Sequence, residues 1–136
     1  MIKPKTSTFS INVVGVTTGE KWTGDFTAKS YLSYRDIMAM DRYRRDLIGD
    51  KPENASIRAV NQSEVLSQIF ARLTKAPAWW GEHSQGLDCV DDNLIEEIFL
   101  AAVKVETDER EAIKKKGEAA QASLRETLKA EDAPKA

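Results

Sequence analysis

The sequence has very few of the residues that support disulfide or metal chemistry. Among its 136 residues there is one cysteine and one histidine. A lone cysteine cannot form an internal disulfide, which fits a reducing cytosol. The first residues lack the apolar core of a signal peptide, and no apolar run approaches the roughly 20 residues of a membrane-spanning helix. We therefore expect a protein of the cytoplasm that does not enter a membrane.

An excess of charge of one sign is lacking as well. The formal net charge is only −2, so no overall field favours nucleic acid or an anionic membrane. The arginine cluster Arg42, Arg44 and Arg45 lies within helical reach of Asp41 and Asp46, which neutralise it. This balance predicts a protein that does not bind nucleic acid.

Catalytic motifs are absent. The sequence contains no phosphate-binding loop, dinucleotide fingerprint or serine elbow. His83, Asp88, Cys89, Asp91 and Asp92 are close together, but their spacing does not match the paired cysteine or histidine ligands of a zinc site. Asp91 and Asp92 are better used to cap a helix, and the acids around Cys89 disfavour the thiolate that cysteine catalysis needs. We predict a protein that is not an enzyme, with no metal ion and no cofactor.

The N-terminal part predicts a β-hairpin over residues 8–28. Apolar and polar residues alternate from Thr8 and again from Lys21, as is typical of half-buried strands. Between the two runs, Thr17-Thr18-Gly19-Glu20 indicates a turn, because Gly19 can adopt a positive φ. An isolated hairpin is marginal in water, so its aromatic face must pack on helices or on another subunit.

Three amphipathic helices are predicted after the hairpin, over about residues 33–48, 55–75 and 91–105. Ser33 and Asp36 form a capping-box pair at the start of the first. Pro77 is expected to end the second. The third has a core stripe at helical spacing: Leu94, Ile95, Ile98, Phe99, Ala102 and Val105. Residues 1–105 thus read as a single α+β domain, in which the hairpin packs on a small bundle of about three helices.

The composition changes from Glu106 onward. Residues 106–136 are rich in Glu, Lys, Ala, Gln and Arg. Helix propensity is high, but we find no apolar stripe that would offset the entropy of ordering the segment. We expect the helix to continue to about Lys116 and then to fray, leaving a charged tail that is helical or disordered.

The adjacent tryptophans Trp79 and Trp80 are the strongest binding feature. Tryptophan is enriched among interface hot spots because it desolvates a large area with little loss of rotamer entropy. It also closes cores. We expect one of the two to pack in the core and the other to contact a partner.

Two further pairs are candidate contacts. Leu100 and Val103 lie outside the apolar stripe of their helix, which fits either a second contact surface or two isolated surface residues. Asp41 and Arg44 lie inside the apolar arc of the helix over residues 33–48. They either pair with each other at i,i+3 or set the register of a partner on that arc.

Several of these elements, taken in order, resemble the tail assembly chaperones of tailed bacteriophages and prophages. The resemblance covers roughly residues 8–105. The segments that carry it are Phe9-Ser10-Ile11-Asn12-Val13, Thr18-Gly19-Glu20-Lys21-Trp22-Thr23-Gly24-Asp25-Phe26-Thr27-Ala28-Lys29, Leu32-Ser33, Asp41-Arg42-Tyr43-Arg44-Arg45-Asp46-Leu47-Ile48-Gly49, Ala76-Pro77-Ala78-Trp79-Trp80, Gly86-Leu87-Asp88 and Asp92-Asn93-Leu94-Ile95.

The resemblance implies a non-enzymatic assembly factor in the host cytoplasm. Such proteins coat the tape-measure protein, keep it soluble and help recruit tail-tube subunits, and a homo-oligomer is possible. The alternative is a structural virion protein, such as a capsid decoration, head–tail or tail component, that is retained in the particle. The two differ in whether the finished particle contains the chain.

Overall fold

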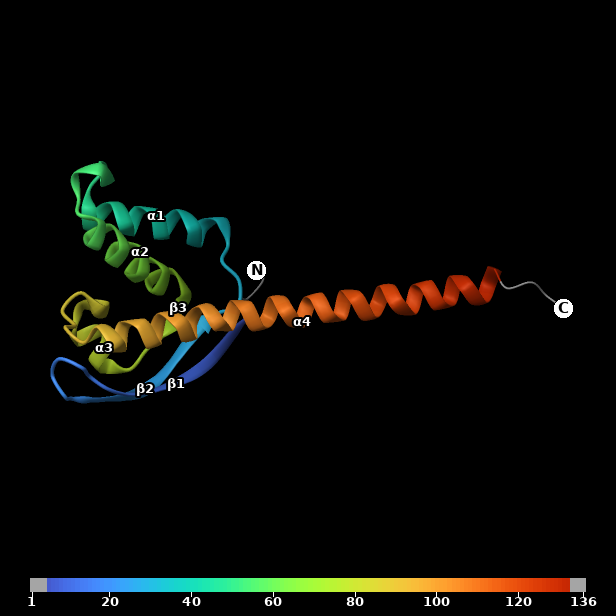
Figure 1. Ribbon diagram of the computed structural model, residues 1–136, viewed down its shortest axis with the longest axis horizontal. Coiled ribbons are helices and arrows are strands. Elements are labelled where there is room, and N and C mark those ends of the chain that lie inside the picture. The colour runs from blue at the N-terminus through green and yellow to red at the C-terminus, as the bar shows by residue number, and fades with distance from the viewer. Residues whose placement is uncertain (1–4, 133–136) are drawn as a thin grey trace. The chain divides into compact units, whose positions relative to one another are not determined.

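The computed structural model describes residues 5–132, and these adopt an α+β fold (Figure 1). The described residues form three strands and four α-helices. In chain order the elements are β1 (Thr6–Val14), β2 (Lys21–Lys29), α1 (Tyr34–Ile48), the 3₁₀ turn η1 (Pro52–Asn54), α2 (Ile57–Arg72), β3 (Leu73–Lys75), α3 (Ala78–Glu82), the 3₁₀ turn η2 (Ser84–Gly86) and α4 (Asp92–Asp132).

The chain divides into two compact units, Met1–Glu106 and Thr107–Ala136. The first contains the sheet, α1 to α3 and the N-terminal part of α4. In the second, the helix continues to Asp132, so the prediction that it frays near Lys116 was wrong. Between Thr107 and Lys129 every residue except Glu109 is exposed. None of the described helices is long and apolar enough to cross a membrane.

The predicted hairpin is confirmed. β1 and β2 pair antiparallel in a regular register that runs from Thr6 opposite Lys29 to Val14 opposite Lys21. Gly19 has a φ of +72° in the connecting turn, a conformation that glycine adopts without a Cβ penalty. One face of the hairpin carries its aromatic side chains into the core, and the other carries polar ones.

The end of the second helix was predicted wrongly. α2 ends at Arg72, and Leu73–Lys75 form a short strand that pairs with Thr27 and Ala28 of β2. This pairing gives the edge of β2 a hydrogen-bonded neighbour, which a longer helix could not supply. Pro77 consequently precedes α3 instead of ending α2.

The first helix begins as predicted but is not buried. Ser33 and Asp36 form the full capping box. No residue of α1 is fully buried, and the helix packs on α2 through a parallel stack of Tyr43 on Phe70 with ring centroids 4.2 Å apart. Much of the apolar arc of α1 is therefore left for another contact.

The core lies between the sheet, α2, α3 and the first turns of α4 (Figure 1). The predicted stripe of α4 supplies Leu94, Ile98 and Ala102, each with 0% exposure. The other fully packed core residues are Ile11, Trp22, Phe26, Ile69 and Trp80.

Candidate functional site

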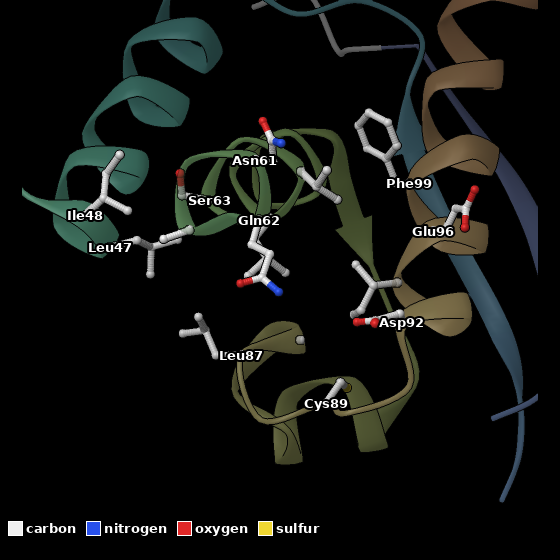
Figure 2. A pocket seen from close by; sticks show the side chains of 15 residues that line it. Leu47, Ile48, Asn61, Gln62, Ser63, Leu87, Cys89, Asp92, Glu96 and Phe99 are labelled. Carbon is white, nitrogen blue, oxygen red and sulfur yellow. The ribbon is translucent and has the colours of Figure 1, made fainter. Parts of the chain in front are cut away.

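An open groove lies beside this core, within the first unit (Figure 2). Its volume is about 460 Å³. Four parts of the chain supply its walls: the end of α1, the N-terminal half of α2, the segment around η2 and the first turns of α4. The lining residues are Leu47, Ile48, Ala59, Asn61, Gln62, Ser63, Val65, Leu66, Gly86, Leu87, Cys89, Asp92, Ile95, Glu96 and Phe99.

The walls of the groove are mostly apolar and incompletely covered. None of the large apolar residues that line it is fully buried, and Leu87 at its mouth is 48% exposed. The charged residues among the lining set, Asp92 and Glu96, are both acidic and stand on α4. Covering half-solvated apolar side chains with a partner removes them from water, which lowers the free energy and favours binding.

The segment around η2 owes its shape to Gly86. This residue has a φ of +97° and is buried. A Cβ placed on it would lie 2.7 Å from Trp80 Cη2 and 3.0 Å from Leu66 Cδ2. The close approach turns the chain so that Leu87 and Cys89 reach the groove. Ser84 and Gln85 also have positive φ, which L-residues adopt at a cost.

A continuous chain of polar contacts joins the three helices that form the groove. Arg44 of α1 pairs with Asp41 and donates to Glu64 of α2 at 2.9 Å. Hydrogen bonds from Gln68 and Arg44 hold the pKa of Glu64 below its usual value. The series of polar contacts continues along α2, where Gln68 donates to Glu64 and Arg72 donates to Gln68.

This series of polar contacts reaches α4 through Arg72. Its Nη1 lies 2.9 Å from a carboxylate oxygen of Glu106, and the side chains of Arg72 and Glu106 are 8% and 15% exposed. The predicted pair of Asp41 and Arg44 is therefore present and is part of the contact between α1 and α2. Asp41 also pairs with Arg45.

The two tryptophans differ in burial. Trp80 is 4% exposed and makes edge contacts with Phe26 and Trp79, so it is a core residue that is not available to a partner. Trp79 is half-buried, and its indole N–H donates to the carbonyl of Thr23 at 2.9 Å. Its ring lies against Trp22 and Phe26. Both side chains thus hold α3 on the sheet.

The other predicted pair, Leu100 and Val103, is not among the residues that line the groove. Leu100 is 54% exposed, and Val103 is half-buried. Residues four apart lie on the same face of a helix, so Val103 follows Phe99 along the wall of α4 that lines the groove. Leu100 lies further round the helix surface.

The cluster from His83 to Asp92 does not converge on one point. His83 Nδ1 is hydrogen-bonded to the Trp79 carbonyl at 2.7 Å. Burial, together with the charges of Asp91 and Asp88, raises the pKa of the Cys89 thiol, which leaves less of the nucleophilic thiolate. Among residues 5–132, no group of three or more histidine, cysteine or acidic residues has the geometry of a metal site.

Asp91 immediately precedes α4, and its backbone carbonyl accepts from the amides of Leu94 and Ile95 as an N-cap residue does, but its side chain does not cap the helix. Its carboxylate accepts hydrogen bonds from the amides of Thr17 and Thr18, the hydroxyl of Thr18 and the indole N–H of Trp22, at 2.7–2.9 Å. Burial alone would raise the pKa of Asp91, but these hydrogen bonds, those of Thr18 foremost, lower it to about 2. The predicted N-cap position of Asp91 is confirmed. The expectation that its side chain caps the helix was wrong, because the carboxylate bonds to the hairpin turn and Trp22.

The sequence did not reveal the groove itself. Phe99, for example, was interpreted only as part of the core stripe of the helix over residues 91–105. One signal was present in the apolar arc of the helix over residues 33–48, since the last residues of that helix, Leu47 and Ile48, line the groove. Comparisons of the chain with protein-family models, with curated proteins and with solved structures give no match.

Proposed function

We propose that this chain is a non-enzymatic assembly factor of the tail assembly chaperone type, which acts in the host cytoplasm. In this proposal it binds an amphipathic helical segment of the tape-measure protein and helps recruit tail-tube protein. The partners come from the family resemblance. The open apolar groove supports the binding mode.

The groove suits an amphipathic helix. Such a helix presents apolar side chains at i, i+3, i+4 and i+7, and grooves that receive it are lined by apolar residues from flanking helices. Here α2 and α4 supply the two walls, with Leu66 on one and Ile95 and Phe99 on the other. Binding would cover these half-solvated side chains and, on the partner, the apolar face that otherwise promotes aggregation.

The acidic residues of the groove favour a partner helix that carries basic side chains. Asp92 and Glu96 are one turn apart on α4 and exposed. Lysine or arginine beside the apolar stripe of the partner helix would meet them with opposite charge. Such complementarity contributes to register and association rate more than to affinity.

The test is mass spectrometry of purified phage particles alongside the lysate that produced them. We expect the chain in the lysate, associated with the tape-measure protein, and not in the finished particle. Stoichiometric presence in the particle would contradict the proposal and favour the alternative, a structural virion protein.

A further inference from the structure

β1 lies at the edge of the sheet, and β2 is its neighbour. Two contacts show which residues of β1 bond across the hairpin: the Gly15 amide donates to the Glu20 carbonyl, and the Ser30 amide donates to the Lys5 carbonyl, both at 2.8 Å. Hydrogen-bonded pairs alternate along an antiparallel ladder, so the odd-numbered residues of β1 bond to β2. The even-numbered residues direct their backbone N–H and C=O groups to the open edge: Thr6, Thr8, Ser10, Asn12 and Val14.

The fold covers the opposite edge of the sheet. There β3 pairs with the end of β2, and the Thr74 hydroxyl donates to the Thr27 carbonyl at 3.3 Å. Further along β2, the Trp79 indole donates to the Thr23 carbonyl. On β1, in contrast, Asn93 of α4 donates to the Val14 carbonyl at 2.9 Å. Within residues 5–132, the backbone edge groups of Thr8, Ser10 and Asn12 have no hydrogen-bond partner.

The composition of β1 leaves this edge unprotected. Soluble proteins guard edge strands with lysine, proline, bulges or short length, because an open edge is a template for another strand. β1 is nine residues long, contains no charged residue and no proline, and keeps a regular register with β2 over its whole length. These features are expected of a strand edge that another strand covers in the assembled protein.

We infer that β1 pairs antiparallel, edge to edge, with β1 of a second copy of this chain, which joins the two sheets into one. A second copy suits the edge because a strand without charges meets no like-charge repulsion when it pairs with itself. The alternation of side chains between the two faces of the sheet also matches. In both copies the side chains of Ser10 and its even-numbered neighbours lie on the solvent face, while those of Phe9 and Ile11 lie on the core face. This inference does not depend on the helical partner proposed above.

The bond from Asn93 to Val14 selects the register. It occupies the C-terminal end of the edge and leaves Thr6 to Asn12 for pairing. The register that pairs the whole of this segment with itself, and nothing beyond it, places Thr6 opposite Asn12 and Thr8 opposite Ser10 and puts Phe9 on the twofold axis. The two Phe9 residues would form a non-hydrogen-bonded pair, with Cα atoms about 4.5 Å apart. Because Phe9 is half-buried and stacked on Phe26 at 5.5 Å, the pair would extend the aromatic row across the axis.

The first test is the mass of the full-length chain by sedimentation equilibrium. We expect the wild type to be a dimer and Ser10→Pro to be a monomer with an unchanged circular dichroism spectrum. The Ser10 N–H faces the open edge, so proline removes an intersubunit donor and spares the ladder with β2. The matched control is Ser10→Ala, which loses only the hydroxyl bond to Asp25 and should stay dimeric. A monomeric wild type, or a folded Ser10→Pro chain that remains dimeric, would overturn the inference.

The second test is cross-linking in a Cys89→Ser background, and it does not require the proline variant to fold. Thr8→Cys chains are mixed with Ser10→Cys chains and oxidised. Opposed residues of a hydrogen-bonded pair have Cα atoms about 5.5 Å apart, within the range of a disulfide. We expect a cross-linked dimer in the mixture and little in either variant alone. A cross-link in the Ser10→Cys chains alone would overturn the register with Phe9 on the axis. The absence of any cross-link would overturn the edge pairing.

Discussion

At the scale of single residues, Asp91 connects segments that are far apart in the sequence. Its carboxylate receives four hydrogen bonds from the hairpin turn and Trp22, and it is 1% exposed. The turn approaches so closely that a Cβ on Gly15 would lie 2.2 Å from the Asp91 carboxyl group. This carboxylate therefore holds the turn of the hairpin on the start of α4.

We predict that the contribution of Asp91 to stability depends on pH. Its pKa is lowered from 3.8 to about 2, so the folded state favours the ionised form. The stabilisation is complete above the unfolded pKa of 3.8 and is lost as the pH falls from there towards about 2. Asp91→Asn lacks the charge and should be less stable than the wild type at neutral pH, with the difference narrowing through this window.

Urea unfolding followed by tryptophan fluorescence at a series of pH values measures this difference. Asp92→Asn, an exposed neighbour, is the control and should stay close to the wild type. A difference between Asp91→Asn and the wild type that stays constant from neutral pH to about pH 2 would contradict the proposed cause.

At the scale of secondary-structure elements, Trp80 joins α3, the sheet and η2. It contacts Phe26 and lies against the backbone of Gly86. Trp80→Ala should lower the free energy of unfolding by about 3 kcal/mol or more, the usual cost of removing a large buried aromatic side chain. Chemical denaturation measures the loss. Tyr34→Ala, at a position that is 85% exposed, should change stability by no more than about 0.5 kcal/mol. Equal effects of the two variants would contradict the core role of Trp80.

The ion pairs between helices differ in burial, and this allows a paired prediction. Arg72→Met removes both the ion pair with Glu106, in which the side chains are 8% and 15% exposed, and the hydrogen bond to Gln68. It should destabilise the fold by about 3 kcal/mol, because breaking a buried ion pair costs far more than breaking an exposed one. Arg45→Met breaks a pair whose arginine side chain is 55% exposed and should cost less than about 1 kcal/mol. Thermal and urea unfolding of both variants test the difference. A loss for Arg72→Met as small as that for Arg45→Met would show that the buried pair adds little.

The elements that the sequence predicts well are those with local signals. Alternation gives the hairpin, the pair of Ser33 and Asp36 gives the start of α1, and the 3.6-residue period gives the buried stripe of α4. β3 could not be predicted in this way, because its three residues become a strand only through pairing with β2, which is distant in the sequence. The role of Asp91 was missed for the same reason, since its hydrogen-bond donors precede it by about seventy residues.

At the scale of the whole molecule, the candidate site was less predictable than the fold. The groove exists because α1 and α2 pack against each other and leave space beside the first turns of α4. No single stretch of sequence records that space. The two tryptophans illustrate the limit, because their hydrophobicity and position fit a core or an interface equally well. Packing in three dimensions decides that Trp80 lies in the core.

The groove and the predicted surface around Leu100 can be distinguished with two matched variants. Leu87 at the groove mouth is 48% exposed, and Leu100 is 54% exposed, so a charge at either position should leave the fold intact. Leu87→Asp places a carboxylate against the apolar stripe of a bound helix and should weaken binding by about 2 kcal/mol, roughly thirtyfold. Leu100→Asp lies outside the groove and should bind like the wild type. The measurement is titration calorimetry with amphipathic segments of the proposed partner, the tape-measure protein. A loss of affinity confined to Leu100→Asp would show that the partner binds the outer face of α4. Wild-type affinity in both variants would show that the partner contacts neither surface.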